Sequence, residues 1–248
     1  MADVIETSTQ GPLGRIASFS PDWDIPCGIW VVDTQLCSNI GEPVLVAAER
    51  TRRASFRDAA DRTRFEIGAG LLRSVAAILV GVDPGAVVVD RTCPTCGGQH
   101  GKPYIQNSGL HVSVSHSGTL VVVATTFAGA VGVDVEQVRS ADISSLATRV
   151  CAPGESISGP AEFYPLWCRK EAVAKATGEG LVVPFSEVVV RPMTEQAGLE
   201  AYRGRPIACA MADLEVKTGY AGAVAVLAPG RLELRIHDGR EVLLGRPG

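Results

Sequence analysis

The sequence has little of what marks several common classes of protein. Aromatic residues make up only 5% of its 248 positions, and the formal net charge is -4. General nucleic-acid binders need a basic excess to neutralise phosphates, so this balance argues against nucleic acid as a partner. The first 14 residues lack the basic start and apolar core of a signal peptide, and no apolar run is long enough to span a bilayer. We therefore expect a cytoplasmic protein without a membrane span.

A disulfide framework is also missing. Seven cysteines, an odd number, are scattered through the chain, which is typical of reduced thiols in the cytoplasm. The chain is longer than a usual single domain, and its apolar content is ample for a core. We expect a flexible lead-in over 1–14, an N-terminal half over 15–128 and a C-terminal half over 129–248.

Hydrophobic patterning predicts an α/β (α+β) protein in which each half packs a long helix on a small sheet. Helices are expected over Val46–Val80, over Ala141–Val150, and from a first turn containing Pro165 to Thr177. Strands are expected over Cys27–Asp33, Ala86–Asp90, His111–His116, Leu120–Ala124, Gly132–Glu136, Val182–Val190, Ile207–Leu214, Tyr220–Leu227 and Leu232–Ile236. A glycine precedes an apolar strand in Ser117–Ala124 and again in Thr218–Ala225. This similarity suggests an internal duplication with the functional site at the seam.

The first predicted helix is rich in arginine. Such density usually marks a solvated face balanced by acids, but the early half of this helix is less balanced and could instead bind an anion, for which the bidentate guanidinium is suited. The candidate anion ligands are Arg50, Arg53, Arg62 and Arg64.

The loop from Cys93 to Pro103 contains a Cys-x-x-Cys pair followed by His100. Cys93, Cys96 and His100 could supply three zinc ligands, yet no second Cys pair follows at the spacing of a zinc finger. A turn-rich loop with free thiols is therefore favoured. Lys102, at the end of the loop, is either a surface lysine or a phosphate contact.

A Ser-His pair, Ser115 and His116, lies in the predicted turn that ends one strand and precedes Gly118. Polar groups there are often turn chemistry alone, but clustered donors can also hold an oxyanion. The Gly-x-Ser-x-Gly motif of hydrolases is absent from the sequence, so no Ser-His-Asp triad is implied.

Two carboxylates alternate with apolar residues in the strand that begins the second half. Successive side chains of a strand face opposite sides, so Asp134 and Glu136 point together while Val133 and Val135 face the core. Neighbouring carboxylates repel unless they are protonated or bridged by a cation, and oxygen ligands suit magnesium beside a phosphate. A solvated strand face is the alternative.

The helix ending at Thr177 carries further candidates. At 3.6 residues per turn, Trp167, Glu171 and Lys175 fall on one face, a turn apart. Taken alone, Glu171 and Lys175 are an ordinary surface ion pair. As a third carboxylate beside Asp134 and Glu136, Glu171 favours a metal site.

Three blocks together resemble the Sfp-type 4'-phosphopantetheinyl transferases. They are Ser115-His116-Ser117-Gly118, then Gly132-Val133-Asp134-Val135-Glu136, then Trp167-x-x-Lys170-Glu171-Ala172-x-x-Lys175-x-x-Gly178-x-Gly180-Leu181, with Gly101-Lys102-Pro103 in support. Their order and rough spacing match, and the resemblance covers most of the chain from Arg50 onward. The lead-in and the segment after Leu227 carry no recognisable motif.

The resemblance implies two pseudo-twofold-related halves with coenzyme A in the cleft between them. The 4'-phosphopantetheine arm would pass to a serine of an apo acyl- or peptidyl-carrier protein, with release of adenosine 3',5'-bisphosphate. Carriers of polyketide, nonribosomal peptide or fatty acid synthesis are the expected partners, and one chain would build the site as a monomer.

The resemblance also implies roles for individual residues. Asp134, Glu136 and Glu171 would hold Mg2+, and Glu171 would also deprotonate the carrier serine. Lys175, Lys102, Ser115 and His116 would contact coenzyme A phosphates. One or more of Arg50, Arg53, Arg62 and Arg64 would hold its 3'-phosphate, although the spacing here departs from the family pattern. The Cys93–His100 loop departs too, and the alternative function is a non-catalytic zinc-loop, Arg-rich module that binds RNA or protein.

Overall fold

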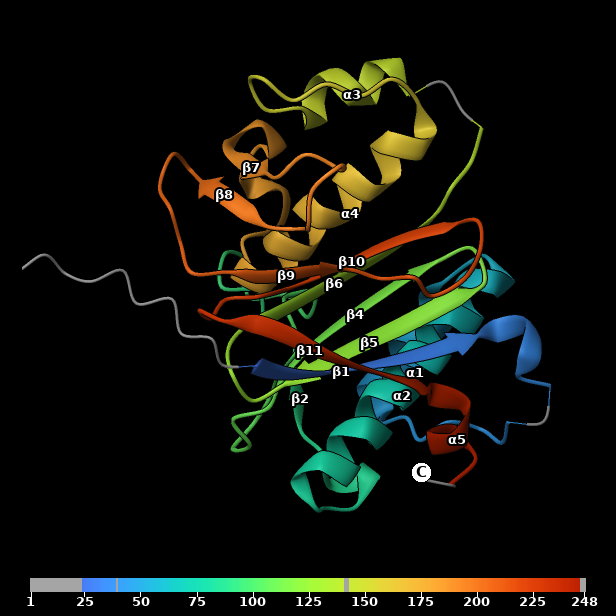
Figure 1. The fold of residues 1–248 in the computed structure, drawn as a ribbon. Helices are drawn as coiled ribbons and strands as arrows, with labels where there is room; N and C mark the ends of the chain where they lie inside the picture. The colour runs from blue at the N-terminus through green and yellow to red at the C-terminus, as the bar shows by residue number, and fades with distance from the viewer. Residues whose placement is uncertain (1–23, 39, 141–142, 246–248) are drawn as a thin grey trace, which may run out of the picture.

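Two packed sheets, each with a long helix on its outer face, form the centre of the molecule (Figure 1). A computed structural model describes residues 24–38, 40–140 and 143–245, so the expected lead-in over 1–14 lies outside the described residues. The larger sheet has the strand order β11 (Arg231–Asp238), β1 (Asp24–Asp33), β5 (Leu120–Thr126), β4 (His111–Ser117), β3 (Tyr104–Ile105) and β2 (Val89–Asp90). The smaller sheet has the order β6 (Val131–Gln137), β10 (Tyr220–Val226) and β9 (Ala210–Asp213), and β7 (Val188–Val190) pairs with β8 (Leu199–Tyr202).

Helices cover the outer faces of both sheets. Within the described ranges they are α1 (Ala47–Ser55), α2 (Ala59–Val80), α3 (Ser144–Val150), α4 (Pro160–Thr177) and α5 (Gly239–Leu243). None of these helices is long and apolar enough to cross a membrane.

Side chains of β5 and β6 alternate between the two faces of each strand, and this alternation determines which layer each residue packs against. On β5, Val121 and Val123 pack with α2, whereas Leu120, Val122 and Ala124 face the smaller sheet. On β6, alternate valines enter the same inter-sheet core, as predicted, which leaves the side chains between them for the face under α4. The order of layers is therefore α2, large sheet, small sheet, α4.

The arginine-rich region forms two helices, so the single predicted helix over Val46–Val80 was wrong in that respect. Phe56 is extended, and Asp58 begins α2 by accepting a hydrogen bond from the Asp61 amide at 2.9 Å. This capping residue starts a new helix because it satisfies an amide that has no partner inside the helix. Gly81 ends α2 in the left-handed conformation, as its position predicts.

Helix α4 ends at Thr177 as predicted but begins at Pro160, five residues before Pro165. Pro160 occupies the first turn, where a missing amide costs nothing, and Pro165 lies inside the helix. Gly178 closes the helix with a φ of 77°. The helix approaches β6 closely at Gly132, where a Cβ would stand 1.9 Å from the Ala172 carbonyl oxygen.

Several other predicted boundaries were wrong. Only Val188–Val190 of the expected strand Val182–Val190 is extended, because 180–182 and 185–187 form short 3-10 turns around Pro184. The strand predicted over Ala86–Asp90 is limited to β2, since 84–86 is also a 3-10 turn. Strand β4 continues through Ser117, so Ser115 and His116 lie in the strand and not in the turn.

The last strand returns to the first. Strand β11 pairs in parallel with β1, so the end of the chain completes the sheet of the N-terminal half. The mixed α/β class agrees with the prediction, and each half contains a helix packed on a sheet. The pseudo-twofold relation and the boundary between 128 and 129 stay predictions.

Candidate functional site

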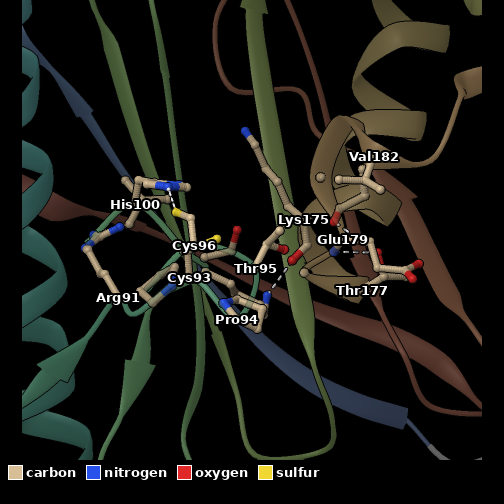
Figure 2. A pocket seen from close by; sticks show the side chains of 18 residues that line it. Arg91, Cys93, Pro94, Thr95, Cys96, His100, Lys175, Thr177, Glu179 and Val182 are labelled. Atoms are coloured by element: carbon tan, nitrogen blue, oxygen red, sulfur yellow. Dashed lines mark hydrogen bonds between the residues drawn. The ribbon is translucent and has the colours of Figure 1, made fainter. Parts of the chain in front are cut away.

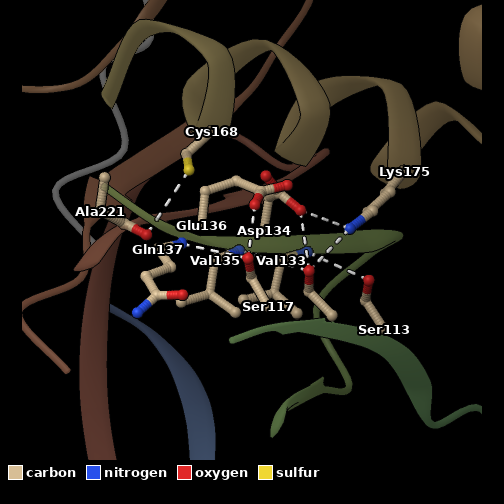
Figure 3. A network of polar contacts seen from close by, with 11 residues as sticks. Ser113, Ser117, Val133, Asp134, Val135, Glu136, Gln137, Cys168, Lys175 and Ala221 are labelled. Carbon is tan, nitrogen blue, oxygen red and sulfur yellow. Dashed lines mark hydrogen bonds and ion pairs between the residues drawn. The ribbon is translucent and has the colours of Figure 1, made fainter. Parts of the chain in front are cut away.

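A row of serines on β4 joins the two sheets at their seam (Figure 3). Ser113, Ser115 and Ser117 accept hydrogen bonds from the amides of Val133, Val135 and Gln137 at 3.1, 3.3 and 3.1 Å respectively. Strands β4 and β6 belong to different sheets, so these hydroxyls satisfy amides of β6 that face β4. The alternation of serines along β4 was the available sequence signal for this row, and the roles of Ser113 and Ser117 were missed.

Asp134 and Glu136 point away from the inter-sheet core toward α4, as predicted (Figure 3). Ser115 donates to Asp134 Oδ1 at 2.8 Å, and Lys175 Nζ lies 2.6 Å from the same oxygen. Ser117 donates to Glu136 Oε2 at 2.6 Å. Asp134 is 3% exposed, and its Oδ2 atom is buried without a hydrogen-bond partner. Oδ1 of this carboxylate thus has two hydrogen-bond partners, and Oδ2 has none.

Glu171 belongs to the same electrostatic group. Burial raises its pKa, the charge of Lys175 opposes this rise, and the charges of Asp134 and Glu136 add to it. Burial also raises the pKa of Glu136, against the hydrogen bond from Ser117 and with the charge of Asp134. The charges of Asp134 and Glu136 thus reach Glu171 across the space between β6 and α4.

Asp134 is the carboxylate with the clearest place for a divalent cation, whereas the ligand atoms of Asp134, Glu136 and Glu171 do not all lie within 4.8 Å of one another. The free Asp134 Oδ2 needs a partner, and three acidic side chains with hydroxyl support supply the hard oxygen ligands that Mg2+ prefers. Burial is the main cause of the raised pKa values of Glu136 and Glu171, and a bound cation would offset both this cost and the repulsion from Asp134.

Lys102 lies at the seam between the halves. Its Nζ donates to the Lys175 carbonyl oxygen at 2.7 Å and to that of Val131. Burial, followed by the charge of Lys175, lowers its pKa to about 8. The Lys102 amine therefore joins the end of α4 to the start of β6. A phosphate bound by Lys102 would be a further partner of the same amine.

A pocket of about 830 Å³ opens beside these residues (Figure 2). Lys175 and Glu179 lie on one side of it, and the loop that carries Cys93, Cys96 and His100 lies on the other. Lys102 and Ser113 also line it. Its volume is within the range of small-molecule sites, and it lies between the two halves of the chain. Glu179 was not predicted; its carboxylate accepts a hydrogen bond from Tyr202.

His116 and Arg64 lie together on the α2 side of the large sheet. Partial shielding from water, then the charges of Arg64 and Lys175, lower the pKa of His116. Arg64 donates to the Gly118 carbonyl oxygen at 2.9 Å and pairs with Asp61. His116 and Ser115 are neighbours in a strand and so face opposite sides of it, and only Ser115 reaches the carboxylates.

The other predicted arginines are placed differently. Arg53 on α1 pairs with Glu66 on α2 at 2.6 Å, and Arg50 on α1 donates to the Leu45 carbonyl oxygen. Arg62 lies near the start of α2. Of the four, Arg64 is tied to the β4–β5 turn at the seam, and the binding roles of all four stay predictions.

The Cys93 loop brings its three candidate ligands together. In the part of the chain that the structure describes, this is the one set of His, Cys, Asp or Glu side chains with three ligand atoms all within 4.8 Å of one another. Hydrogen bonds from the amides of Cys96 and Thr95 lower the pKa of Cys93. The loop was predicted to carry free thiols, and the described cysteines are unpaired.

Known proteins with related sequences identify the family of this chain. Residues 130–225 match the 4'-phosphopantetheinyl transferase superfamily, and this segment contains Asp134, Glu136, Glu171 and Lys175. The chain is 35% identical over 170 residues to the 4'-phosphopantetheinyl transferase HetI of Nostoc sp. (strain PCC 7120), a match that covers 63% of this chain and 69% of the relative.

Two relatives from Bacillus match over longer stretches. The 4'-phosphopantetheinyl transferase psf-1 of Bacillus pumilus is 27% identical over 201 residues, which is 77% of this chain and 83% of the relative. The 4'-phosphopantetheinyl transferase Sfp of Bacillus subtilis (strain 168) is 28% identical over 191 residues, which is 73% of this chain and 80% of the relative. The match to HetI, together with the superfamily match over 130–225, shows that the chain belongs to the 4'-phosphopantetheinyl transferase superfamily.

Proposed function

We propose that this enzyme transfers the 4'-phosphopantetheine arm of coenzyme A to a serine of an apo acyl- or peptidyl-carrier protein. The observation that carries the proposal is the convergence of Lys175 and Ser115 on the Asp134 carboxylate between β6 and α4, with the Glu136 carboxylate held nearby by Ser117. Such a site combines an ammonium and a hydroxyl, which bind phosphate oxygens, with acids that bind a metal. Adenosine 3',5'-bisphosphate is the second product.

Coenzyme A would enter the pocket at the seam. We propose that Lys175, which lines the pocket, contacts the pyrophosphate, with Ser115 hydrogen-bonded to Lys175 Nζ behind it. Lys102 also lines the pocket and donates to the Lys175 carbonyl oxygen at the end of α4. Arg64 carries a positive charge beside the β4–β5 turn, and His116 lies next to it, so this pair is our proposal for a further phosphate contact. Arg50, Arg53 and Arg62 remain candidates for the 3'-phosphate on the neighbouring helices.

Asp134, Glu136 and Glu171 are the residues that would hold Mg2+. When bound, the ion neutralises charge on the non-bridging oxygens of the pyrophosphate and on the leaving group. Ser115 and Ser117 orient Asp134 and Glu136 through hydrogen bonds, which fixes the ligands before the substrate arrives. Lys175 adds a positive charge on the same side.

The reaction needs a proton acceptor because a serine hydroxyl is a weak nucleophile. Its oxygen attacks the phosphorus that carries the pantetheine arm, the bond from that phosphorus to the bridging oxygen breaks, and the adenosine bisphosphate leaves with the electron pair. Glu171 takes the hydroxyl proton, directly or through water, because a carboxylate held beside the reacting phosphate can accept it. No covalent enzyme intermediate is required.

The experiment is a mass measurement on an apo carrier protein mixed with enzyme, coenzyme A and Mg2+. The carrier should gain the mass of one phosphopantetheine arm. Glu171→Gln and Asp134→Asn should abolish this gain while the protein stays folded, and Glu162→Gln, the same change near the exposed start of α4, should retain it. No mass gain across a panel of carriers would refute the proposal, and full activity of Glu171→Gln would refute the assigned base.

We expect a monomer, because two halves of one chain could build the whole site. The alternative of a non-catalytic, zinc-dependent RNA- or protein-binding module predicts salt-sensitive RNA binding and no affinity for coenzyme A. Both affinities can be measured on the same preparation, and coenzyme A binding without RNA binding is the result that we expect.

A further inference from the structure

The loop between β2 and β3 gathers three metal-binding side chains away from the carboxylate site. The thiols of Cys93 and Cys96 and the imidazole of His100 place one ligand atom each within 4.8 Å of the others, and Cys96 Sγ lies 2.9 Å from His100 Nε2. Cys96 and His100 are exposed and Cys93 is half-buried, so an ion can reach all three from solvent. The side chains face one another in Figure 2.

The backbone of the loop already holds the two thiols in position. The Cys93 amide donates to the Gly98 carbonyl oxygen at 2.7 Å, and the Gly97 amide donates to the Cys93 carbonyl oxygen at 2.8 Å. Gly97 takes a φ of 72°, a conformation that other residues rarely adopt. These contacts fix the backbone on both sides of the Cys-x-x-Cys pair, and the thiolate is the form of cysteine that binds metal.

Gly98 leaves space that the ligands need. A Cβ at this position would stand 3.1 Å from His100 Cδ2, 3.3 Å from His100 Nε2 and 3.4 Å from Cys96 Sγ. Any side chain here would therefore press on the imidazole and the second thiol together. The glycine keeps the two ligands free to close around a common centre.

Further contacts anchor the loop to the rest of the protein. The Gly101 amide donates to the Arg91 carbonyl oxygen at 2.7 Å, which closes the loop at its base. Arg52 of α1 donates to the Gln99 carbonyl oxygen at 2.9 Å, and the Gln99 side chain donates to Thr92 at 3.0 Å. The three ligands thus belong to a built loop, so less order has to be created when an ion binds.

We infer that Cys93, Cys96 and His100 form a zinc site, separate from the Asp134–Glu136–Glu171 set and selective for a softer ion. Two sulfurs and one imidazole are typical zinc ligands, whereas Mg2+ takes oxygen ligands. With bonds of about 2.3 Å to sulfur and about 2.0 Å to nitrogen, tetrahedral ligand atoms are about 3.5–3.8 Å apart. Binding therefore requires the Cys96–His100 contact to open by about half an ångström, and the fourth position is filled by water.

The proposed zinc site lies in the wall of the pocket. The three ligands line the pocket opposite Lys175 and Glu179, and Lys102 follows His100 by two residues. An ion that crosslinks the loop would fix this wall of the pocket and the segment leading to Lys102. Because the ligands do not include the proposed catalytic residues, zinc binding is expected whether or not a variant transfers phosphopantetheine.

The chemical competitor of zinc is oxidation. Two thiols separated by two residues can form a disulfide, which would remove both sulfur ligands. Zinc binding and disulfide formation are therefore mutually exclusive states of the same pair. The test is made with thiols kept reduced, and the free-thiol count is measured in parallel.

The first measurement is the zinc content of the full-length protein after incubation with ZnCl2 and removal of free metal. The expected result is one zinc per chain in the parent and in Cys37→Ser, which changes a half-buried cysteine outside the loop. Cys93→Ser, Cys96→Ser and His100→Ala should each reduce the content to near zero while their circular dichroism matches the parent. Less than stoichiometric zinc in the reduced parent, or unchanged zinc in all three variants, would overturn the inference.

Cobalt provides a second test, on the unmodified protein. Co2+ should give the intense visible absorption of a tetrahedral site with thiolate ligands, and equimolar Zn2+ should abolish it. Bound Zn2+ should also protect two cysteines from alkylation, and digestion followed by mass spectrometry should identify them as Cys93 and Cys96. Octahedral cobalt spectra, or protection of other cysteines, would contradict the assigned ligands.

Discussion

Lys175 Nζ lies 2.6 Å from Asp134 Oδ1, and this contact joins the last turn of α4 to the middle of β6. The same ammonium donates to Ser115 Oγ at 3.0 Å. Lys175 therefore neutralises one oxygen of a buried carboxylate, while Asp134 Oδ2 is left without a partner. The ion pair presents a free carboxylate oxygen beside a positive charge, which is the combination that a metal-bound phosphate requires.

Replacement of this lysine should separate catalysis from folding. Lys175→Met removes the positive charge proposed for the pyrophosphate, and we expect transfer to fall by at least about 100-fold, the scale of losing one electrostatic stabiliser. Lys217→Met, which removes a surface lysine paired with Asp33, should stay within about twofold of the parent. Initial rates of carrier modification at saturating Mg2+ provide the measurement. A Lys175→Met rate within about threefold of the parent would exclude the lysine from the reaction.

Close packing at Gly132 should be essential to the site. A Cβ at this position would meet the Ala172 carbonyl oxygen at 1.9 Å and the Ala176 amide nitrogen at 2.4 Å, and neither backbone atom can rotate away. Gly132→Ala should therefore push α4 from β6, reduce the free energy of unfolding by about 1–3 kcal/mol or more, and weaken transfer because Glu171 and Lys175 move with the helix. Gly41→Ala, with no atom within 4 Å, is the control. Urea unfolding and transfer assays on both variants would check this, and a Gly132→Ala protein as stable as the control would show that the helix is not held there.

The serine row offers a matched pair of changes. Ser117→Ala and Ser113→Ala each remove an acceptor from a β6 amide, so each should cost about 1–2 kcal/mol of stability. Only Ser117→Ala also removes the donor to Glu136 Oε2, which orients a proposed metal ligand. The Mg2+ concentration for half-maximal transfer should rise about tenfold in Ser117→Ala and stay near the parent value in Ser113→Ala. Equal Mg2+ requirements in the two variants would remove Glu136 from the metal site.

Periodicity explains how much of this site was predictable. The alternation of Asp134 and Glu136 with valines and the spacing of Glu171 and Lys175 by one turn both follow from local geometry. Once β6 and α4 face each other, Lys175 comes within reach of Asp134. The serine row was harder to foresee, because its hydroxyls bridge strands of different sheets, and no local pattern states which strands become neighbours.

The predicted element boundaries were wrong where two sequence signals for a helix start or end lie close together. Pro165 indicates the start of a helix by propensity, yet Pro160 fills that role and α4 tolerates Pro165 inside it. Asp58 is a good capping residue, but a continuous run of helix formers around it hid the break between α1 and α2. The pairing of β11 with β1 connects the two ends of the described chain, and such long-range contacts leave no mark on sequence spacing.

Acid should weaken the contact between the first strand and the loop before β10. Lys217 Nζ lies 2.5 Å from Asp33 Oδ2, and although partial burial by itself would raise the pKa of Asp33, the Lys217 and Gln35 hydrogen bonds lower it overall from 3.8. A carboxyl group with a lowered pKa contributes stability above its unfolded value and loses this contribution as the pH falls through the folded value. The advantage of the parent over Lys217→Met in the free energy of unfolding should therefore be constant at neutral pH and should disappear below pH 3.8. Urea titrations from neutral to acid pH would measure it, with Asp33→Asn as the comparison that lacks the titrating group. An advantage that persists unchanged in acid, or one that is also present on the Asp33→Asn background, would assign the effect of Lys217 to another contact.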